Sequence, residues 1–318
     1  MHVDDFLWAG TSAFKELVID RICTKFRVGN QMEGNFRYIG VEISQTEDVI
    51  LLNQHSYVNE MVNVPLHYNR ANDKDGMLNK KETKQLREVI GQSNWVVNQS
   101  RPDVCFDSLE LSMSTKHPRV ENLLQANKLI RRIKADTYSL AFPKLGNLAD
   151  IEIILFSDAS YANLSDGVSS AGGHIIFLKG ENGKCCPISW STKKIRRVVK
   201  STIAAEALSL VDGLDTAFYV GSIITEILYR GANCNKIPIN CYIDNRSLYE
   251  NLHSTKSVNE KRLRIDIAAV KEMMQKGEIS KVKWIEASNQ LSDCLTKKGA
   301  SSKKLINVLK TGQISTLN

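Results

Sequence analysis

Residues 154–163 read ILFSDASYAN, in which an apolar run is followed, after Ser157, by an acid, Asp158. The four consecutive apolar residues 153–156 predict a buried strand. An Asp at the carboxyl end of such a strand directs its carboxylate into the crevice beside the next strand end, where sites collect in sheet proteins. This stretch therefore predicts a strand that delivers one carboxylate to a functional site.

Three further carboxylates complete a possible metal-binding set. Glu206 lies in a helical pattern, Asp244 ends a second apolar run, and Asp293 opens the sequence SDCLTKKGA. Two strand ends, a helical Glu and a late Asp can hold two Mg²⁺ ions about 3.5–4 Å apart, on either side of a scissile phosphate. Any one of these acids alone is more often a solvated acid. The ordered set of four favours a two-metal nuclease.

The order of predicted elements after residue 150 agrees with that chemistry. It is strand, strand, strand, helix, strand, helix, strand, helix, with acids on the first strand, the first helix, the fourth strand and the last helix. This is the pattern of ribonuclease H, an α/β fold with a mixed five-stranded sheet. The predicted segments are 151–160, 169–179, 185–193, a long helix from 201, 237–244, 260–276, 281–287 and 292–310.

Bulk properties permit this interpretation without requiring it. The 318 residues are 42% hydrophobic, enough for two domains with cores, and the net charge of +7 favours a polyanionic partner. Seven Cys without a C-x-x-C pair indicate reduced thiols. Because no apolar run approaches about 18 residues, we expect a soluble, intracellular protein, cytoplasmic or nuclear, with no membrane partner. We expect no small-molecule substrate, and the oligomeric state stays open.

The first 150 residues predict a different kind of structure. The paired acids Asp4 and Asp5 lie between apolar residues and predict the tip of a hairpin, although a plain acidic turn explains them equally well. Ser12 is predicted to cap a helix. The other predicted segments are strands at 36–44 and 49–54, a polar loop or linker at 69–81, helices at 81–100 and 120–136, and a strand with a connector at 138–150.

Eight stretches of the chain resemble the polyprotein of a copia-type retrotransposon. They are HVDDFLWAGT (2–11), FRYIGVEI (36–43), LNQHSYVNEM (52–61), VIGQSNWVVNQSRPDVCFD (89–107), FSDASY (156–161), STIAAEALSL (201–210), YIDNRSL (242–248) and NQLSDCLTKKG (289–299). The two parts of the polyprotein that these stretches mark together cover nearly the whole chain. The resemblance implies a truncated reverse-transcriptase palm and thumb remnant at 1–75, a helical connection region at 76–150 and a ribonuclease H-like domain at 151–318.

The resemblance also implies roles for the acids. Four of them match the family's metal-binding and catalytic acids, with two Mg²⁺ as cofactor and Mn²⁺ able to substitute: Asp158, Glu206, Asp244 and Asp293. Asp4 and Asp5 match the paired acids of the polymerase palm. Polymerisation needs a third palm carboxylate on an earlier strand and the fingers, and only two residues precede Val3 and Asp4 in the motif VDD. We therefore expect a remnant without reverse-transcriptase activity.

Several neighbours of the acids have two interpretations each. Asn245 and Ser247 either bond the substrate backbone or a 2′-hydroxyl, or cap the helix predicted at 246–252. A basic cluster either tracks phosphates or forms a solvated face: Lys193, Lys194, Arg196, Arg197 and Lys200. A second basic group on the helix at 260–276 can grip the DNA strand: Lys261, Arg262 and Arg264.

Three positions are interpreted as structural or as departures from the pattern. Asp166 lies in a turn-like loop, and His174 alternates into a strand, so both are expected to be structural. Many cellular ribonucleases H carry a mobile His shortly before the final acid, but the last His here is His253. Glu286 or Asn289 would be the partial substitutes.

The predicted reaction is Mg²⁺-dependent endonucleolytic cleavage of the RNA strand in an RNA–DNA hybrid, with selectivity from 2′-hydroxyl contacts across the minor groove. One alternative is an inert or co-opted element fragment that only binds nucleic acid. A second is a transposase or integrase, which shares this fold but places its Glu after the fourth strand. The position of Glu206 between Asp158 and Asp244 disfavours strand transfer.

Overall fold

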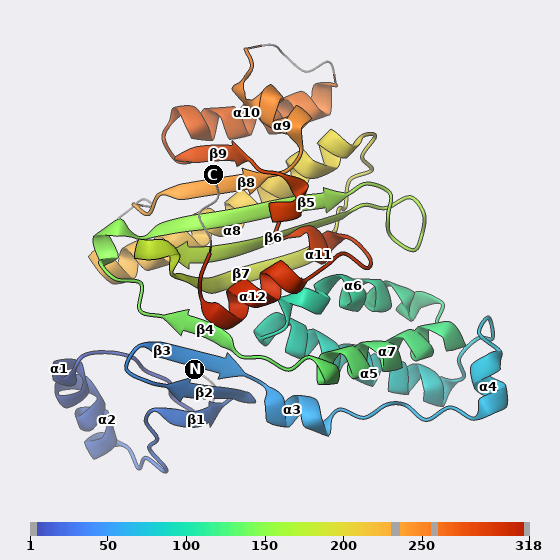
Figure 1. Ribbon diagram of the computed structural model, residues 1–318. Helices are drawn as coiled ribbons and strands as arrows, with labels where there is room; N and C mark the ends of the chain where they lie inside the picture. The colour runs from blue at the N-terminus through green and yellow to red at the C-terminus, as the bar shows by residue number, and fades with distance from the viewer. Residues whose placement is uncertain (1–4, 230–235, 256–259, 315–318) are drawn as a thin grey trace.

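The computed structural model describes residues 5–229, 236–255 and 260–314 and contains a five-stranded and a four-stranded sheet (Figure 1). In the larger sheet, the first three strands in chain order pair antiparallel and the last two add parallel. The spatial order is β7 (Cys185–Lys194), β6 (Ala171–Lys179), β5 (Glu152–Ser160), β8 (Ile239–Ile243) and β9 (Lys281–Trp284). This order confirms the predicted α/β fold class with a mixed five-stranded sheet.

Strand β5 is buried on both faces, which explains its unbroken apolar run. Ile153 and Leu155 belong to a core that includes the long helix α8 (Thr202–Tyr229), whereas Ile154 and Phe156 belong to a core on the opposite face. The first core is completed by α9 (Arg246–His253) and α10 (Lys261–Gln275). The central strand therefore ties together both halves of the domain.

Helix α8 is long and apolar enough, by length and composition, to cross a membrane. In this structure the helix packs on β5 and β6, and 44% of its most apolar 18-residue stretch is buried. The core helix of a soluble domain passes the same test of length and composition.

The predicted last helix is two helices. They are α11 (Asp293–Thr296) and α12 (Lys303–Thr311). Gly299 separates them with a φ of +73°, in the left-handed region that favours glycine. The single-helix prediction is therefore wrong, and Asp293 opens a short helix of its own.

The smaller sheet is an antiparallel array whose fourth strand comes from much later in the chain. It consists of β1 (Asn35–Tyr38), β2 (Val41–Gln45), β3 (Val49–Asn53) and β4 (Leu140–Pro143). The single strand predicted at 36–44 is wrong. Ile39 and Gly40 both have positive φ (47° and 74°), the requirement of a two-residue hairpin turn, so the segment folds back on itself.

The N-terminal segment partly follows its prediction. A continuous helical stretch runs through α1 (Ser12–Phe14), a π-helical turn at Lys15–Ile19 and α2 (Asp20–Lys25). Its cap is Thr11, whose side chain accepts the Phe14 N–H at 3.3 Å, and not Ser12. Asp4 lies outside the described residues. Asp5 is exposed, and residues 5–11 contain no strand, so the described part of the predicted hairpin is irregular.

The middle of the chain is helical, as predicted for 81–100 and 120–136. The helices are α3 (His55–Glu60), α4 (Tyr68–Asn72), α5 (Lys80–Gln99), α6 (Cys105–Met113) and α7 (Val120–Ala135). The predicted loop at 69–81 is wrong at its start, where α4 lies. Arg70 in α4 bonds both carboxylate oxygens of Glu82 at 2.9 Å and the Met77 carbonyl at 2.6 Å, which folds this polar segment against α5.

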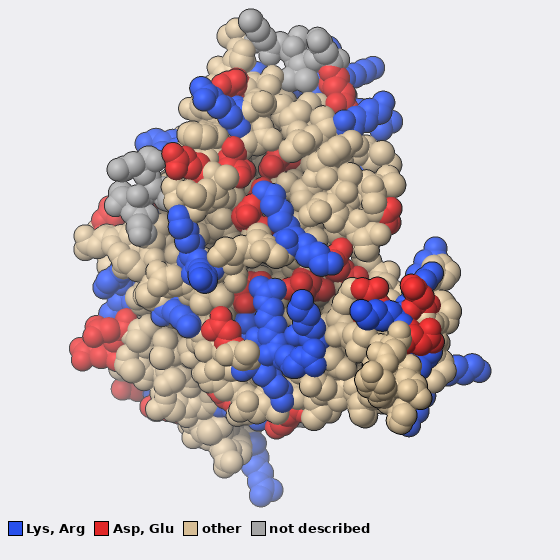
Figure 2. Space-filling view, turned by 45° about the vertical axis from the view of Figure 1, so that its right-hand side comes forward, with Lys and Arg blue, Asp and Glu red and all other residues tan. Residues whose placement is uncertain are grey.

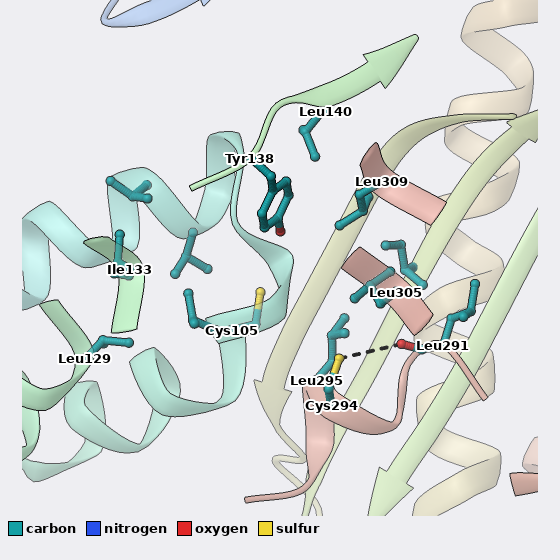
Figure 3. Close-up of a cluster of buried hydrophobic side chains, with 14 of the residues drawn as sticks. Cys105, Leu129, Ile133, Tyr138, Leu140, Leu291, Cys294, Leu295, Leu305 and Leu309 are labelled. Carbon is teal, nitrogen blue, oxygen red and sulfur yellow. Dashed lines mark hydrogen bonds between the residues drawn. The ribbon is translucent and has the colours of Figure 1, made fainter. Parts of the chain in front are cut away.

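One apolar core extends across the boundary predicted at residue 150. Figure 3 shows side chains from the helical region and β4 facing side chains from α11, α12 and the preceding loop. The labelled residues are Cys105, Leu129, Ile133, Tyr138 and Leu140 on one side, and Leu291, Cys294, Leu295, Leu305 and Leu309 on the other. The division into three segments stays a prediction, but the second and third share their core.

Candidate metal centre

Three of the four predicted acids converge on one point. Ligand oxygens of Asp158, Asp244 and Asp293 lie within 4.8 Å of one another. Asp158 is in β5 and Asp244 follows β8, and the two strands run parallel with Phe156 opposite Tyr242, which brings both acids to the same sheet edge. Asp293 reaches this edge as the first residue of α11. The convergence follows from strand pairing plus the docking of one short helix.

Asp158 is fully buried at the centre of this group. The Thr296 hydroxyl donates a hydrogen bond to its Oδ2, and the Lys297 ammonium lies 3.3 Å from its Oδ1. Burial raises the pKa of Asp158 to about 6, although Lys297 and Thr296 both favour its charged form. A nearby cation stabilises the charged form of such a buried carboxylate.

Glu206 faces the same group from α8. Its side chain is only 4% exposed, and among the described residues its Oε2 has no hydrogen-bond partner. Burial, followed by the charges of Asp158 and Asp244, raises its pKa well above the usual range. Buried carboxylate oxygens without a protein donor, next to other carboxylates, are the ligands that hard divalent cations take. The donor set of the four acids therefore fits Mg²⁺.

Gln290 orders the edge between Asp158 and Asp244. Its Nε2 donates to the Ser157 carbonyl at 3.0 Å, its Oε1 accepts the Ser292 hydroxyl at 2.8 Å, and its side chain also bonds Asp244. Burial raises the pKa of Asp244, and Asp293 adds to that effect. This buried amide thus links β5, the end of β8 and the start of α11.

A glycine and a serine bring α11 and α8 close to Asp158. A Cβ added at Gly173, opposite Asp158 in β6, would lie 2.8 Å from Thr296 Cγ2, so only glycine lets α11 approach this strand. The Ser209 hydroxyl donates to the Asp158 carbonyl at 2.8 Å and accepts the Gly173 N–H at 3.1 Å, which fixes α8 to the same edge.

The sequence prediction missed Gln290, Thr296 and Lys297. A local signal existed for the last two, because they follow Asp293 by three and four residues, the spacing that shares one helix face. Gln290 gave no such signal, since its role depends on the position of Ser157, 133 residues earlier.

The other residues considered near the acids include a helix cap, a buried core residue and a turn residue. Asn245 caps α9, accepting the Leu248 N–H at 2.9 Å, whereas Ser247 is exposed. His174 is packed as expected: it is buried 3.4 Å from Asp212, and burial lowers its pKa to about 4. Asp166 is structural as expected, since it accepts the N–H groups of the turn at 168–169. Substrate contacts by Asn245 and Ser247 stay a prediction.

The basic cluster lies at the same end of the sheet as Asp158. Gly173 is opposite both Asp158 and Thr192, so the residues after Thr192 continue past the level of the acids. Three cluster members pair with acids of this chain: Lys193 with Asp212 at 3.3 Å, Lys194 with Asp166 at 2.9 Å, and Arg197 with Asp266. Arg196 and Lys200 are exposed, with no acidic partner among the described residues.

The second basic group lies on α10. Lys261, Arg262 and Arg264 are exposed there, and Arg262 shares a shallow recess with Arg197 of the basic cluster. Figure 2 shows that basic and acidic side chains lie side by side on one face of the molecule.

The loop before Asp293 contains the two residues considered as substitutes for a mobile His. Glu286 is exposed, and Asn289 accepts the Lys304 ammonium at 3.0 Å.

Comparison with known proteins places transposon polyproteins among the relatives. The chain is 24% identical over 310 residues to the retrovirus-related Pol polyproteins from transposons RE1 and RE2 of Arabidopsis thaliana, covering 93% of this chain and 20% of each relative. It is 27% identical over 119 residues to a transposon Ty5-1 protein of Saccharomyces cerevisiae, covering 37% of this chain and 36% of that protein. These relatives confirm the resemblance to a copia-type retrotransposon polyprotein fragment. The chain spans about a fifth of the RE1 and RE2 polyproteins.

Similar solved structures include LC11-RNase H1 from compost, at 14% identity and a TM-score of 0.33 over 50% of this chain and 95% of that one. The same enzyme in complex with an RNA/DNA hybrid has 14% identity and a TM-score of 0.33, covering 48% of this chain and 99% of that one. Prototype foamy virus protease-reverse transcriptase has 10% identity and a TM-score of 0.28, covering 64% of this chain and 28% of that one. No family model matches the chain.

Proposed function

We propose that this chain is a retrotransposon-derived ribonuclease H that cuts the RNA strand of RNA–DNA hybrids. The observation that carries the proposal is the convergence of Asp158, Asp244 and Asp293 at one sheet edge. Glu206 faces them with its Oε2, which has no hydrogen-bond partner among the described residues. The arrangement has the donors for two Mg²⁺ ions, or Mn²⁺ in their place. When bound, they would supply the positive charge that activates a water and stabilises the leaving 3′-oxygen.

The protein's own part in this reaction is to hold acids in place. Asp158 is fixed from both sides, by Thr296 at its carboxylate and by Ser209 at its backbone. Gln290 fixes Asp244 relative to the same strand. Because these partners are buried, the carboxylates are pre-organised and water is kept from their inner sides, conditions that strengthen electrostatic stabilisation.

The direct test is cleavage of a duplex with labelled RNA and DNA strands by the purified chain. We expect the RNA strand to be cut in Mg²⁺ or Mn²⁺, with 3′-hydroxyl and 5′-phosphate ends, while the DNA strand and an all-DNA duplex stay intact. EDTA should abolish cutting. Cutting that persists in EDTA would contradict a metal mechanism, and tight binding without any cutting would favour the alternative of an inert, nucleic-acid-binding fragment.

We also expect the chain to have no primer-extension activity. Among the described residues, the only group of three or more metal-type ligands is the one at Asp158, and Asp5 of the paired acids is exposed in an irregular segment. Template-dependent incorporation of nucleotides, measured with a labelled primer in excess Mg²⁺, should stay at background. Incorporation above a no-template control would overturn the proposal that residues 1–75 are a polymerase remnant.

The basic cluster yields a prediction about salt dependence. If Arg196 and Lys200, which have no acidic partner among the described residues, bind phosphates, Arg196→Gln/Lys200→Gln should flatten the slope of log K against log salt. The expected change is up to about 1.8 units, at about 0.9 for each phosphate that the variant no longer neutralises. Hybrids of every sequence should be affected alike, because phosphates carry no base information.

The matched control for this prediction is Lys193→Gln/Lys194→Gln. It removes the same charge from two residues already paired with Asp212 and Asp166. Binding is measured in an Asp158→Asn background so that the hybrid stays whole. Equal slopes for the parent and the Arg196/Lys200 variant would assign the cluster to a solvated face.

A further inference from the structure

Lys297 is a cation inside the carboxylate group. Its ammonium lies 3.3 Å from Asp158 Oδ1 and also pairs with Asp293 Oδ1. It follows Asp293 by one turn of α11 and its immediate neighbour, Thr296, donates to the other oxygen of Asp158. Its side chain is 38% exposed, whereas that of Asp158 is completely buried. The ammonium therefore reaches inward from the mouth of the site.

The position of this ammonium has an electrostatic cause. Three carboxylates with ligand oxygens within 4.8 Å repel one another, and Asp158 has no access to water. Burial of the ammonium disfavours its charge, but Asp158, Asp293 and Asp244 outweigh that effect and raise the pKa of Lys297. Among the described residues it is the one basic side chain paired with acids of this group. It thus supplies the charge that the acids lack without a metal.

A divalent ion in this site would compete with Lys297 for the same carboxylates. Lys297 contacts the Oδ1 atoms of Asp158 and Asp293, and a second cation beside these atoms is disfavoured because like charges repel at such distances. We propose that Lys297 is the internal counter-ion of the metal-free site, and that the first divalent metal ion to bind displaces its ammonium from Asp158 and Asp293. This inference rests on the proposed metal site and adds a competitor to it.

The test is a calorimetric titration of the full chain with Mg²⁺, without nucleic acid. Lys297→Gln should bind Mg²⁺ about tenfold more tightly than the parent, since no ion pair has to break. Lys298→Gln is the matched control, because Lys298 is the next residue and pairs instead with Glu110 at 3.4 Å. It should stay within about twofold of the parent. Lys297→Arg keeps the charge and should keep affinity close to that of the parent.

The stability of the metal-free protein gives a second measure of the ion pairs of Lys297, which a thermodynamic cycle links to the Mg²⁺ affinity. The ion pairs of Lys297 stabilise the metal-free state alone, so Lys297→Gln should melt at a lower temperature than the parent in EDTA. At saturating Mg²⁺ the two should melt together. A tenfold gain in affinity corresponds to about 1.4 kcal/mol. The stability lost in EDTA should match it, because both measure the same ion pairs.

A measurement on the unaltered chain covers the case in which Lys297→Gln does not fold. Amine-reactive labelling, read by mass spectrometry, should modify Lys297 faster at saturating Mg²⁺ than in EDTA, while Lys298 stays unchanged. Equal or weaker Mg²⁺ binding by a folded Lys297→Gln, or labelling of Lys297 that does not rise with Mg²⁺, would overturn the displacement. A parent chain that binds no Mg²⁺ and cuts no hybrid would instead overturn the metal site itself.

Discussion

Asp158→Asn is expected to lower the rate of hybrid cleavage about a thousandfold or more while leaving the fold intact. Asp158 is the buried member of the carboxylate group, which also contains Asp244, just after the neighbouring strand β8, and Asp293 on α11. An amide keeps the shape but removes the charge and one of the two acceptor oxygens. Loss of a shared metal ligand costs several kcal/mol of transition-state stabilisation, which is of the order of 10³-fold in rate.

The measurement is single-turnover cleavage of a labelled hybrid, with circular dichroism and thermal melting to confirm the fold. Asp5→Asn is the control: it makes the same chemical change at an exposed acid of the polymerase-like pair and should cut at the parent's rate. An Asp158→Asn protein that is folded and within tenfold of the parent would exclude Asp158 as a metal ligand.

Two of the four carboxylate positions were accessible from the sequence because they come at the ends of apolar runs. An apolar run marks a strand buried on both faces, and parallel pairing brings the ends of two such runs to one edge, so Asp158 and Asp244 had to meet. The helical periodicity around Glu206 placed it on the helix that covers the same strand. Each of these inferences concerns a single helix or a single pair of strands.

What the sequence did not show depends on contacts between distant segments. The role of Lys297 requires α11 to dock on β6, and that docking requires the absence of a side chain at Gly173. The pairing of Arg197 with Asp266 spans 69 residues, so a run of basic residues looked uniformly free. Likewise, β4 was expected to lead into the next domain, but it pairs with β3 and completes the N-terminal sheet.

A buried ion pair lies beside the core that the helical region shares with the domain carrying Asp158. Arg101 and Asp103 are 3% and 2% exposed and form two hydrogen bonds with each other, at 2.8 and 2.9 Å. The Tyr138 hydroxyl donates to Asp103 at 2.7 Å, and Arg101 donates to the Ile133 carbonyl at 2.7 Å. Asp103 lies in η2 (Pro102–Val104), which packs against α11.

Arg101→Met is therefore expected to lower the free energy of unfolding by about 3–5 kcal/mol, because it leaves Asp103 as an uncompensated buried charge. The measurement is urea denaturation in EDTA, so that metal binding does not contribute. The matched control is Arg246→Met: Arg246 pairs with Glu250 at the similar distance of 2.9 Å, but both side chains are mostly exposed, and the expected loss is about 0.5 kcal/mol or less.

A double variant separates the buried charge from the packing around it. Arg101→Met/Asp103→Asn removes both charges and keeps an acceptor for Tyr138, so it should recover much of the stability that Arg101→Met loses. If the double variant were as unstable as the single one, the loss would come from the packing of the arginine and its bond to Ile133. If Arg101→Met cost no more than Arg246→Met, the ion pair would not hold η2 against the helix that carries Asp293.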